Sequence, residues 1–472
     1  MKIWHTALAL IVLLALGGAL YYVRQNPQVM PQEGFPKEDL FTFDPSQVDG
    51  LTIEIDKESP MVFQKSVDGS QTKWAITSPP GIAGDSKSIE NFIGNLPKIK
   101  AIPLNLEPGT SLSDYGFEQP QRKYSFQITG GQPFDLEVGG ENPNGFARYG
   151  RLAGSEKIFM LDLLNAEPLI RNVLFDYRDK RAVPLDMSQV QQIELQYYLR
   201  GGAPSAQDLE EARRRRLPVN PPKVVFSRQS SGDWKLTSPS VRTDYGTAQE
   251  LIRALENSQI LAYEDENPQS LNRYGLAPEE VRAELRSAAG TSNFIIGNLK
   301  EGEELRYYAR NSIWPYVFTV DQSIYSQLTK DMEQYRSRYL FDYSAAPATR
   351  RLEIQTADGS LRLDRKGDTW ASSDSSQKAI DTAKVDAFLN YIYSLRIQHY
   401  VEDRPNRYDS FGLEAPWIVI KVYTGDSNTE ETVLFGRKGE GFYTARQGEP
   451  SIYEMAPGEP ENIETRLKEL GL

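Results

Sequence analysis

The feature that most constrains the fold is a pattern that occurs three times along the chain. Each of three tryptophans is followed 10 or 11 residues later by an aspartate, and 41 or 42 residues later by a glycine between an aromatic and an apolar residue. A second glycine comes 22 to 24 residues further on. The markers are Trp74, Asp85, Gly116 and Gly139; Trp234, Asp244, Gly275 and Gly297; and Trp370, Asp381, Gly412 and Gly436. A register that holds in three places predicts three diverged copies of one module.

These markers are typical of local structure. Each aspartate precedes apolar residues at helical spacing, such as Ile89, Phe92 and Ile93 in the first copy, and is therefore predicted to cap a helix by accepting its early N–H bonds. The first glycine of each copy is predicted to lie at a turn or helix end, where another residue would be strained. The alternation of apolar and polar residues from Tyr124 to Ile128 is typical of a strand.

The patterns together predict an α+β fold, made of three tandem diverged repeats of one mixed strand and helix module and preceded by one transmembrane helix. We expect the modules to span residues 40–182, 183–345 and 346–472. The tetrapeptide Leu-Phe-Asp-Tyr occurs at both 174–177 and 340–343. We interpret it as a recurring seam between copies.

Residues 3–23 form a run of 21 residues that is apolar except for His5 and Thr6. A helix of this length spans roughly 31 Å at ~1.5 Å per residue, close to the ~30 Å hydrocarbon thickness of a membrane. We therefore expect a single-pass anchor over residues 1–24 and a linker over 25–39. A cleaved signal peptide is the alternative, with 17–19 as the cleavage site. Lys2 favours a cytoplasmic start, which places the body on the periplasmic side of a bacterial inner membrane.

The net charge of the chain limits the kinds of partner that we expect it to bind. The net charge is −12, and residues 1–31 carry Lys2 and Arg24 without any acid, so the remainder carries −12 − 2 = −14. A body this acidic should repel nucleic acid, and we expect no nucleic-acid partner. The absence of cysteine from the sequence excludes disulfides, thiolate catalysis and cysteine-bound metals.

One insertion interrupts the second copy. Residues 199–222 contain Gly201 and Gly202, then a helix-like run that ends in four arginines, then three prolines. The four are Arg213, Arg214, Arg215 and Arg216. They are candidates for docking an acidic partner or anionic lipid headgroups, and a solvated surface excursion is the alternative.

The sequence offers little for catalysis. It has two histidines, His5 and His399, and it has neither a Gly-x-Ser-x-Gly elbow nor a Gly-Lys dipeptide for a phosphate loop. Acidic clusters at 264–266 and 402–403 lie at equivalent places in two copies, which favours a module surface over a glycosidase-like pair. The repeated Arg151, Arg310 and Arg446 are predicted to pack on aromatic rings or to form ion pairs. We expect no catalytic residues, no cofactor and no metal.

The markers together resemble an uncharacterised domain family whose members accompany gliding-motility-type ABC transporters. The likeness rests on the Trp74-type strand, the Asp85-type cap, Tyr-Gly-Leu at 274–276, Ile-Gly at 296–297 and Tyr-Tyr-Ala-Arg at 307–310. The resemblance implies a cell-envelope protein beside a permease, an ATPase and a larger auxiliary protein. The family has no established catalytic residues to carry over.

We therefore expect a non-catalytic accessory, scaffold or binding subunit of an ABC-type transport system. Its expected partners are the membrane and proteins such as the permease, the ATPase complex or an auxiliary envelope subunit. A free-standing envelope protein that binds glycan or peptide is the alternative, and a carboxylate-dependent hydrolase is a third.

Overall fold

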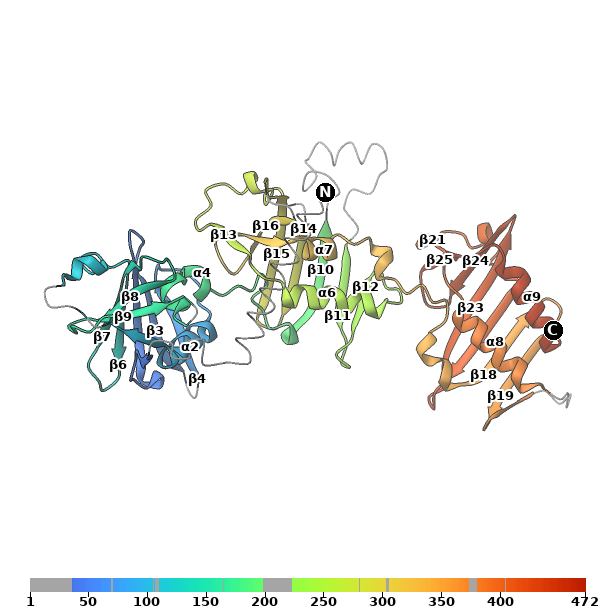
Figure 1. The fold of residues 1–472 in the computed structure, drawn as a ribbon. Coiled ribbons are helices and arrows are strands. Elements are labelled where there is room, and N and C mark those ends of the chain that lie inside the picture. The colour runs from blue at the N-terminus through green and yellow to red at the C-terminus, as the bar shows by residue number, and fades with distance from the viewer. Residues whose placement is uncertain are drawn as a thin grey trace, which may run out of the picture. The chain divides into compact units, whose positions relative to one another are not determined.

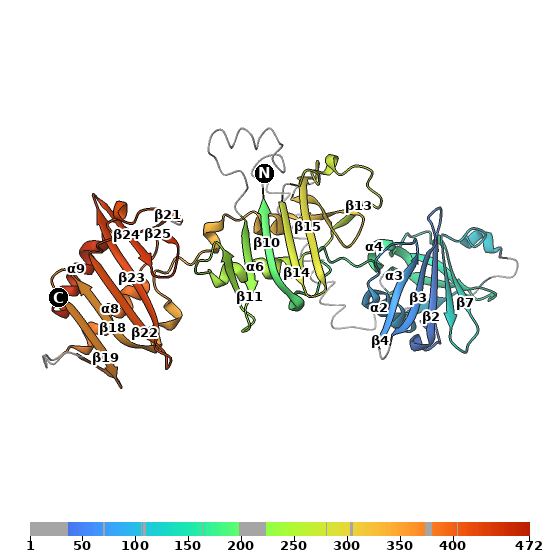
Figure 2. The ribbon, with the colours of Figure 1, turned by 180° about the vertical axis from the view of Figure 1, so that it is seen from behind.

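A computed structural model describes residues 36–472, apart from 69–70, 105, 107–109, 164, 198–222, 280, 303–304, 373–379 and 404. The chain divides into two compact units, and the boundary in the sequence falls between Lys180 and Arg181. The first unit holds one antiparallel sheet and the second holds two (Figures 1 and 2). The three sheets define a first, a second and a third module.

The first module is a nine-stranded sheet in the order β1-β5-β9-β8-β7-β6-β2-β3-β4. Its elements are β1 (Glu38–Asp39), η2 (Pro45–Gln47), β2 (Val48–Ile55), β3 (Met61–Asp68), β4 (Gln71–Ser78), α2 (Ser86–Asn95), η3 (Leu96–Lys98), β5 (Lys100–Pro103), η4 (Leu112–Tyr115), β6 (Arg122–Ile128), β7 (Phe134–Glu141), β8 (Ala147–Leu152), β9 (Phe159–Asp162), α3 (Glu167–Arg171) and α4 (Leu174–Tyr177).

The second module is an eight-stranded sheet in the order β12-β11-β10-β14-β15-β16-β17-β13. Its elements are η5 (Met187–Gln189), β10 (Val190–Tyr197), β11 (Val224–Arg228), β12 (Trp234–Ser238), α6 (Tyr245–Asn257), β13 (Ala262–Asp265), η6 (Asn272–Tyr274), β14 (Val281–Ser287), β15 (Gly290–Leu299), β16 (Arg306–Asn311), β17 (Val317–Asp321), α7 (Gln322–Leu328) and η7 (Met332–Tyr335).

The third module has eight strands in the order β20-β19-β18-β22-β23-β24-β25-β21. Its elements are η8 (Tyr343–Ala348), β18 (Thr349–Thr356), β19 (Ser360–Lys366), β20 (Thr369–Ser372), α8 (Thr382–Ser394), β21 (His399–Asp403), η9 (Asp409–Phe411), β22 (Ile418–Thr424), β23 (Thr429–Lys438), β24 (Gly441–Arg446), β25 (Ser451–Glu454) and α9 (Glu459–Leu470).

The three sheets share one topology, which confirms the repeat. In each module three consecutive strands, β2–β4, β10–β12 or β18–β20, form a meander, the chain crosses the sheet through a helix, and the next strand, β5, β13 or β21, lies on the far side of the sheet. Four more antiparallel strands then fill the space between these two groups. The addition of β1 beside β5 distinguishes the first module. A shared strand order in three places indicates diverged copies of one supersecondary unit.

The helix that begins at the aspartate marker packs on each sheet and helps to close a hydrophobic core. Figure 1 shows α6 across one face of the second sheet, and Figure 2, from behind, shows β10, β14 and β15 on the opposite side. In the first module α2 buries Ile89, Phe92 and Ile93 against the sheet. Each tryptophan marker is 4–5% exposed, so it belongs to the core of its module.

The aspartate markers cap the three helices as predicted. Their carboxylates accept a backbone N–H from the first turn, which satisfies one of the donors that a helix start leaves free. The bonds run to Asp85 from Lys87 at 3.0 Å, to Asp244 from Thr247 at 2.8 Å and to Asp381 from Ala383 at 3.0 Å.

The two glycine markers of each module lie against each other. The first ends a short 3-10 helix with positive φ, at 79° for Gly116, 68° for Gly275 and 67° for Gly412. The second lies in the strand that passes below this turn. A Cβ added at the second glycine would lie 2.1–2.4 Å from the carbonyl oxygen of the residue before the first glycine. The second glycine is therefore required by backbone contact with the turn.

The α+β class predicted from the sequence is wrong, because the described chain is mostly β with three antiparallel sheets. The fourth strand of each module, β5, β13 or β21, went unrecognised. These strands have four or five residues, which is too few for alternation to stand out. The closing helices α3 and α7 have only five and seven residues, so helices form a smaller part of the chain than an α+β fold requires.

The transmembrane part of that prediction is also not supported. Within the part of the chain that the structure describes, no helix is both long enough and apolar enough to cross a membrane. Residues 1–24, on which the anchor was predicted, lie outside the described residues.

The repeated tetrapeptide does not mark equivalent positions, so its interpretation as a seam is wrong. Residues 174–177 form α4 in the closing segment of the first module, whereas 340–343 lead into η8 at the start of the third. The residues that occupy equivalent positions in the three modules are identified by a backbone hydrogen bond that occurs at the start of each module. The bonds run from Leu40 N to Ile99 O, from Ala182 N to Ser258 O and from Leu340 N to Leu395 O.

Candidate functional site

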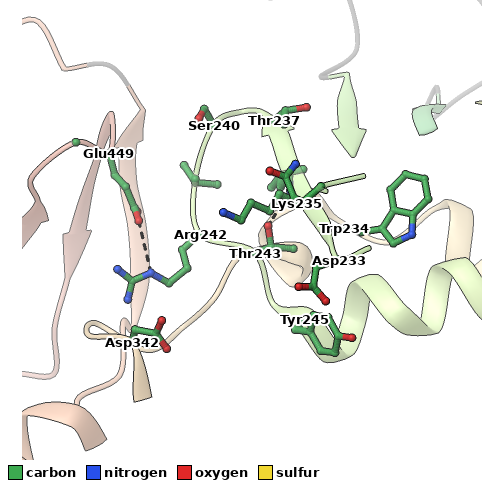
Figure 3. Close-up of a pocket in the computed structure, with 14 residues that line it drawn as sticks. Asp233, Trp234, Lys235, Thr237, Ser240, Arg242, Thr243, Tyr245, Asp342 and Glu449 are labelled. Carbon is green, nitrogen blue, oxygen red and sulfur yellow. Dashed lines mark hydrogen bonds and ion pairs between the residues drawn. The ribbon is translucent and has the colours of Figure 1, made fainter. Parts of the chain in front are cut away.

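A cavity of about 520 Å³ lies in the second unit, where the second and third modules meet (Figure 3). One wall comes from β12, the loop that joins it to α6 and the first residue of α6, and includes Lys235, Arg242 and Tyr245. The other wall comes from the third module and includes Asp342 and Glu449. We call this the seam cavity. An adjoining cavity of about 540 Å³ shares Arg242, Tyr245 and Asp342 with it.

The loop that carries Arg242 is short and held by its own bonds. Val241 N donates to Pro239 O at 3.0 Å, and Leu236 N donates to the Thr243 hydroxyl at 2.7 Å. Thr237 and Ser240 pair across the loop as an isolated bridge. Because the residue after Thr243, Asp244, caps α6, the Arg242 side chain is projected away from the helix and toward the third module.

Arg242 joins the two modules through acidic partners. Its Nη2 lies 2.5 Å from Glu431 Oε1, and its Nε lies 3.8 Å from Glu449 Oε1 (Figure 3 marks the second pair). Glu449 also pairs with Arg446 Nε at 3.0 Å and accepts a bond from the Tyr453 hydroxyl at 2.5 Å. Both glutamates are about 15% exposed, so water screens these pairs less than it would at an open surface.

Arg336 forms a second ion-pair network on the linker between the modules. Its guanidinium contacts both carboxylate oxygens of Asp403, with Nη2–Oδ1 at 2.8 Å and Nη1–Oδ2 at 3.1 Å. Ser451 accepts from Arg336 at 2.7 Å and donates to Asp403 at 2.5 Å. The guanidinium also lies 4.0 Å from the ring centre of Tyr400. Burial raises the pKa of Tyr400 to about 12, so its hydroxyl stays protonated and donates to Arg336 O.

The groups that line the seam cavity are suited to binding. They include hydroxyls, carboxylates and cations, which donate or accept hydrogen bonds. His399, the one histidine in the described range, opens β21 and does not line the cavity. Across the described residues, no group of three or more His, Cys, Asp or Glu side chains could hold a metal ion.

The acidic clusters are engaged in ion pairs. Glu264 lies 2.9 Å from Lys300, and Asp403 is held by Arg336. Asp265 accepts from the Tyr274 hydroxyl at 2.8 Å and pairs with Arg273 at 2.5 Å. The Tyr274 hydrogen bond is the main cause that lowers the pKa of Asp265. A general acid needs the opposite shift.

The other predicted residues fall in several places. Arg213, Arg214, Arg215 and Arg216 lie outside the described residues, in the connection between β10 and β11. Arg151 forms an ion pair with Glu137 at 2.6 Å and lies 4.9 Å from the ring centre of Phe117, as expected. Arg446 is 3% exposed and belongs to the Glu449 network. Arg310 is half-buried on β16.

The residues that join the second and third modules were not predicted from the sequence. One sequence signal could have identified Arg336, because a Tyr-Arg pair occurs at 177–178 and again at 335–336. In the structure both arginines are buried, with 3% of their surface exposed. Tyr177 O and Tyr335 O accept from the backbone N–H groups of the capping aspartates Asp85 and Asp244, which places the two pairs at equivalent positions. Glu431 and Glu449 carry no comparable signal.

Comparison with known proteins identifies one family. The profile of the family described as Domain of unknown function (DUF4340) matches residues 74–264 and 234–409. The two matches begin at Trp74 and Trp234, so they reproduce the offset between the first two tryptophan markers. No curated protein matches the chain.

Proposed function

The chain belongs to the DUF4340 family, and on that premise we propose that it is a non-catalytic accessory or scaffold subunit of an ABC-type transport system of the gliding-motility kind. It works on the periplasmic side of a bacterial inner membrane. Its partners are the permease, the ATPase complex or an auxiliary envelope subunit. It binds them through surfaces that the repeated sheet modules present.

The observation that carries the proposal is the seam cavity. Two modules build it jointly, and its wall holds Arg242 and Glu449 in an ion pair across the seam. Tyr245 is 56% exposed beside these groups. An exposed tyrosine beside fixed charges is a common anchor for a protein partner, because its ring is buried on binding while its hydroxyl forms a hydrogen bond.

The state of the carboxylates supports a non-catalytic role. A hydrolase that uses two carboxylates needs one of them protonated near neutral pH. Asp265 has a lowered pKa, so it does not suit that task, and Asp403 is engaged in an ion pair with a buried arginine. The sequence also contains no Gly-Lys dipeptide, so ATP hydrolysis is assigned to another subunit.

Affinity purification in mild detergent followed by mass spectrometry tests the transport role. We expect the wild-type chain to recover a permease or an ATPase, and Tyr245→Ala to reduce that recovery. Tyr408→Ala is the control, because Tyr408 is also exposed, at 39%, but does not line the seam cavity. Recovery of neither subunit would refute the proposal in favour of a free-standing envelope protein that binds glycan or peptide.

The location is tested separately by fusing alkaline phosphatase after Leu472. The phosphatase is active only where disulfides form, so we expect an active fusion. An inactive fusion together with an active cytoplasmic reporter would place the body inside the cell and overturn this part of the proposal.

A further inference from the structure

A second cavity, in the first unit, has a different character. It is an open cleft of about 350 Å³ between α2 and the closing segment made by α3 and α4. Four asparagines line it: Asn91 and Asn95 from α2, Asn165 before α3, and Asn172 between α3 and α4. Phe92 and Tyr177, which are 8% and 1% exposed, contribute apolar lining. We call this the asparagine cleft.

The other two modules provide an internal comparison. Counting from the capping aspartates, Asn91 corresponds to Glu250 in the second module, and Asn95 corresponds to Tyr391 in the third. Glu250 pairs with Lys330, just after α7, at 2.8 Å. The Tyr391 hydroxyl donates to Glu459 at the start of α9. The closing segment therefore engages the Glu250 position in the second module and the Tyr391 position in the third, whereas Asn91 and Asn95 of the first module line a cavity.

The cleft exists because the closing segment of the first module is broken. α3 has five residues, whereas α7 has seven and α9 has twelve. The chain leaves the helix at Asn172, where ψ is 139°, and turns again into the four-residue α4. Arg122 donates to Asn172 O, and Tyr124 donates to Leu169 O at 2.9 Å. These bonds hold the broken segment in place, so the cavity is preformed.

The polar groups of the cleft are mainly uncharged amides. Each amide can donate and accept at once. Asn172 Nδ2 donates to the Tyr177 hydroxyl at 3.0 Å, and Asn95 Oδ1 accepts from Lys98 at 2.9 Å, which leaves Asn172 Oδ1 and Asn95 Nδ2 for a ligand. The Asn91 amide offers a further donor and acceptor at the same wall. Of the lining residues only Lys98 and Asp176 are charged, with opposite signs, so the cleft selects a neutral ligand.

We propose that the asparagine cleft binds a neutral saccharide of roughly one or two sugar rings, the size suited to a cavity near the small end of the ~300–1,000 Å³ range of ligand sites. The hydroxyl groups of a sugar, which both donate and accept, can form hydrogen bonds with the asparagine amides. The apolar face of a sugar ring can pack against the apolar wall of the cleft that includes Phe92. A peptide that binds by strand addition would need an open strand edge. The residues that line the cleft lie in or beside the helices, and none of them belongs to a strand. This site does not depend on the proposed transport role.

The test measures binding of cellobiose, maltose and N,N′-diacetylchitobiose to the purified full chain by saturation-transfer NMR and calorimetry. Two variants install the residues of the other modules, Asn91→Glu and Asn95→Tyr. Both side chains are exposed, so the variants should fold, and a melting curve checks this. Glu90→Ala, an exposed position on α2 outside the cleft, is the control.

We expect at least one of the three saccharides to bind, and either variant to weaken its binding about tenfold or more, which is ~1.4 kcal/mol. Glu90→Ala should leave the affinity unchanged. The proposal is overturned if none of the three saccharides binds at concentrations up to about 10 mM. It is equally overturned if binding survives both variants, or if short neutral peptides bind the cleft and the saccharides do not.

Discussion

Replacing Gly297 by alanine should destabilise the second module, because no space exists for a methyl group. The added Cβ would lie 2.1 Å from Tyr274 O and 2.8 Å from the Gly275 carbonyl carbon, whereas ordinary contact begins at 3.4 Å. Both neighbours are backbone atoms of a turn fixed by the positive φ of Gly275, so neither can rotate away. β15 and the turn would have to separate by roughly 1 Å, which for overpacked sites costs about 1–3 kcal/mol.

Hydrogen exchange read by mass spectrometry is the suitable assay, because a chain with three modules is not expected to unfold in one step. We expect faster exchange in β15 and its neighbour β16, and unchanged exchange in the first unit. Gly94→Ala is the matched control: Gly94 lies in α2, and its added Cβ would meet nothing within 4 Å. Alanine there should be neutral or stabilise the helix by up to ~1 kcal/mol. Unchanged exchange in β15 of the Gly297→Ala protein would refute the steric argument.

Three other predictions concern buried or capping groups. Arg336→Ala should destabilise the second unit by about 3 kcal/mol in denaturant titrations, because it removes the buried guanidinium that pairs with Asp403. An effect no larger than that of the exposed Arg338→Ala would contradict this. Burial raises the pKa of Tyr124 from 10.0 to about 12, so the contribution of the protonated Tyr124 to folding stability is complete below pH 10 and is lost as the pH rises through 12. Tyr124→Phe should therefore make the loss of stability of the first unit at alkaline pH less steep. An identical dependence of stability on pH in the variant would argue against this role of Tyr124. Asp381→Ala should lower the stability of the third module by about 1 kcal/mol, measured as faster exchange in α8, and normal exchange there would dismiss the cap.

Features that depend on a few neighbouring residues were predictable. An aspartate caps a helix through an N–H two or three residues away, and a glycine ends a 3-10 helix through its own φ angle. Such contacts are encoded by spacing alone, so the roles of Asp85 and Gly116 follow from the order of residues along the chain. Their threefold recurrence then predicted the modules.

Features that depend on partners far along the chain were missed or misread. Four-residue strands such as β5 are defined by pairing with a neighbour more than 50 residues away, Met160 opposite Ile102, so periodicity could not reveal them. The tetrapeptide at 174–177 and 340–343 is identical in sequence, yet only the hydrogen bonds of Leu40 and Leu340 show which segments correspond. Arg242, which lines the seam cavity, pairs with Glu431 at a separation of 189 residues, and no local pattern encodes that pairing.

The sequence by itself determined that the chain repeats one module three times, with a capped helix and a paired glycine in each, because these requirements act over short distances. It did not determine the strand order, the mostly β class or the two cavities. The strand order, the class and the cavities arise where segments far apart in the chain pack together. Small differences in the closing segment, such as the break at Asn172, decide whether a position like Asn95 is covered or faces a cavity. The tertiary structure alone decides this, because packing depends on the length and placement of elements that the local pattern leaves open.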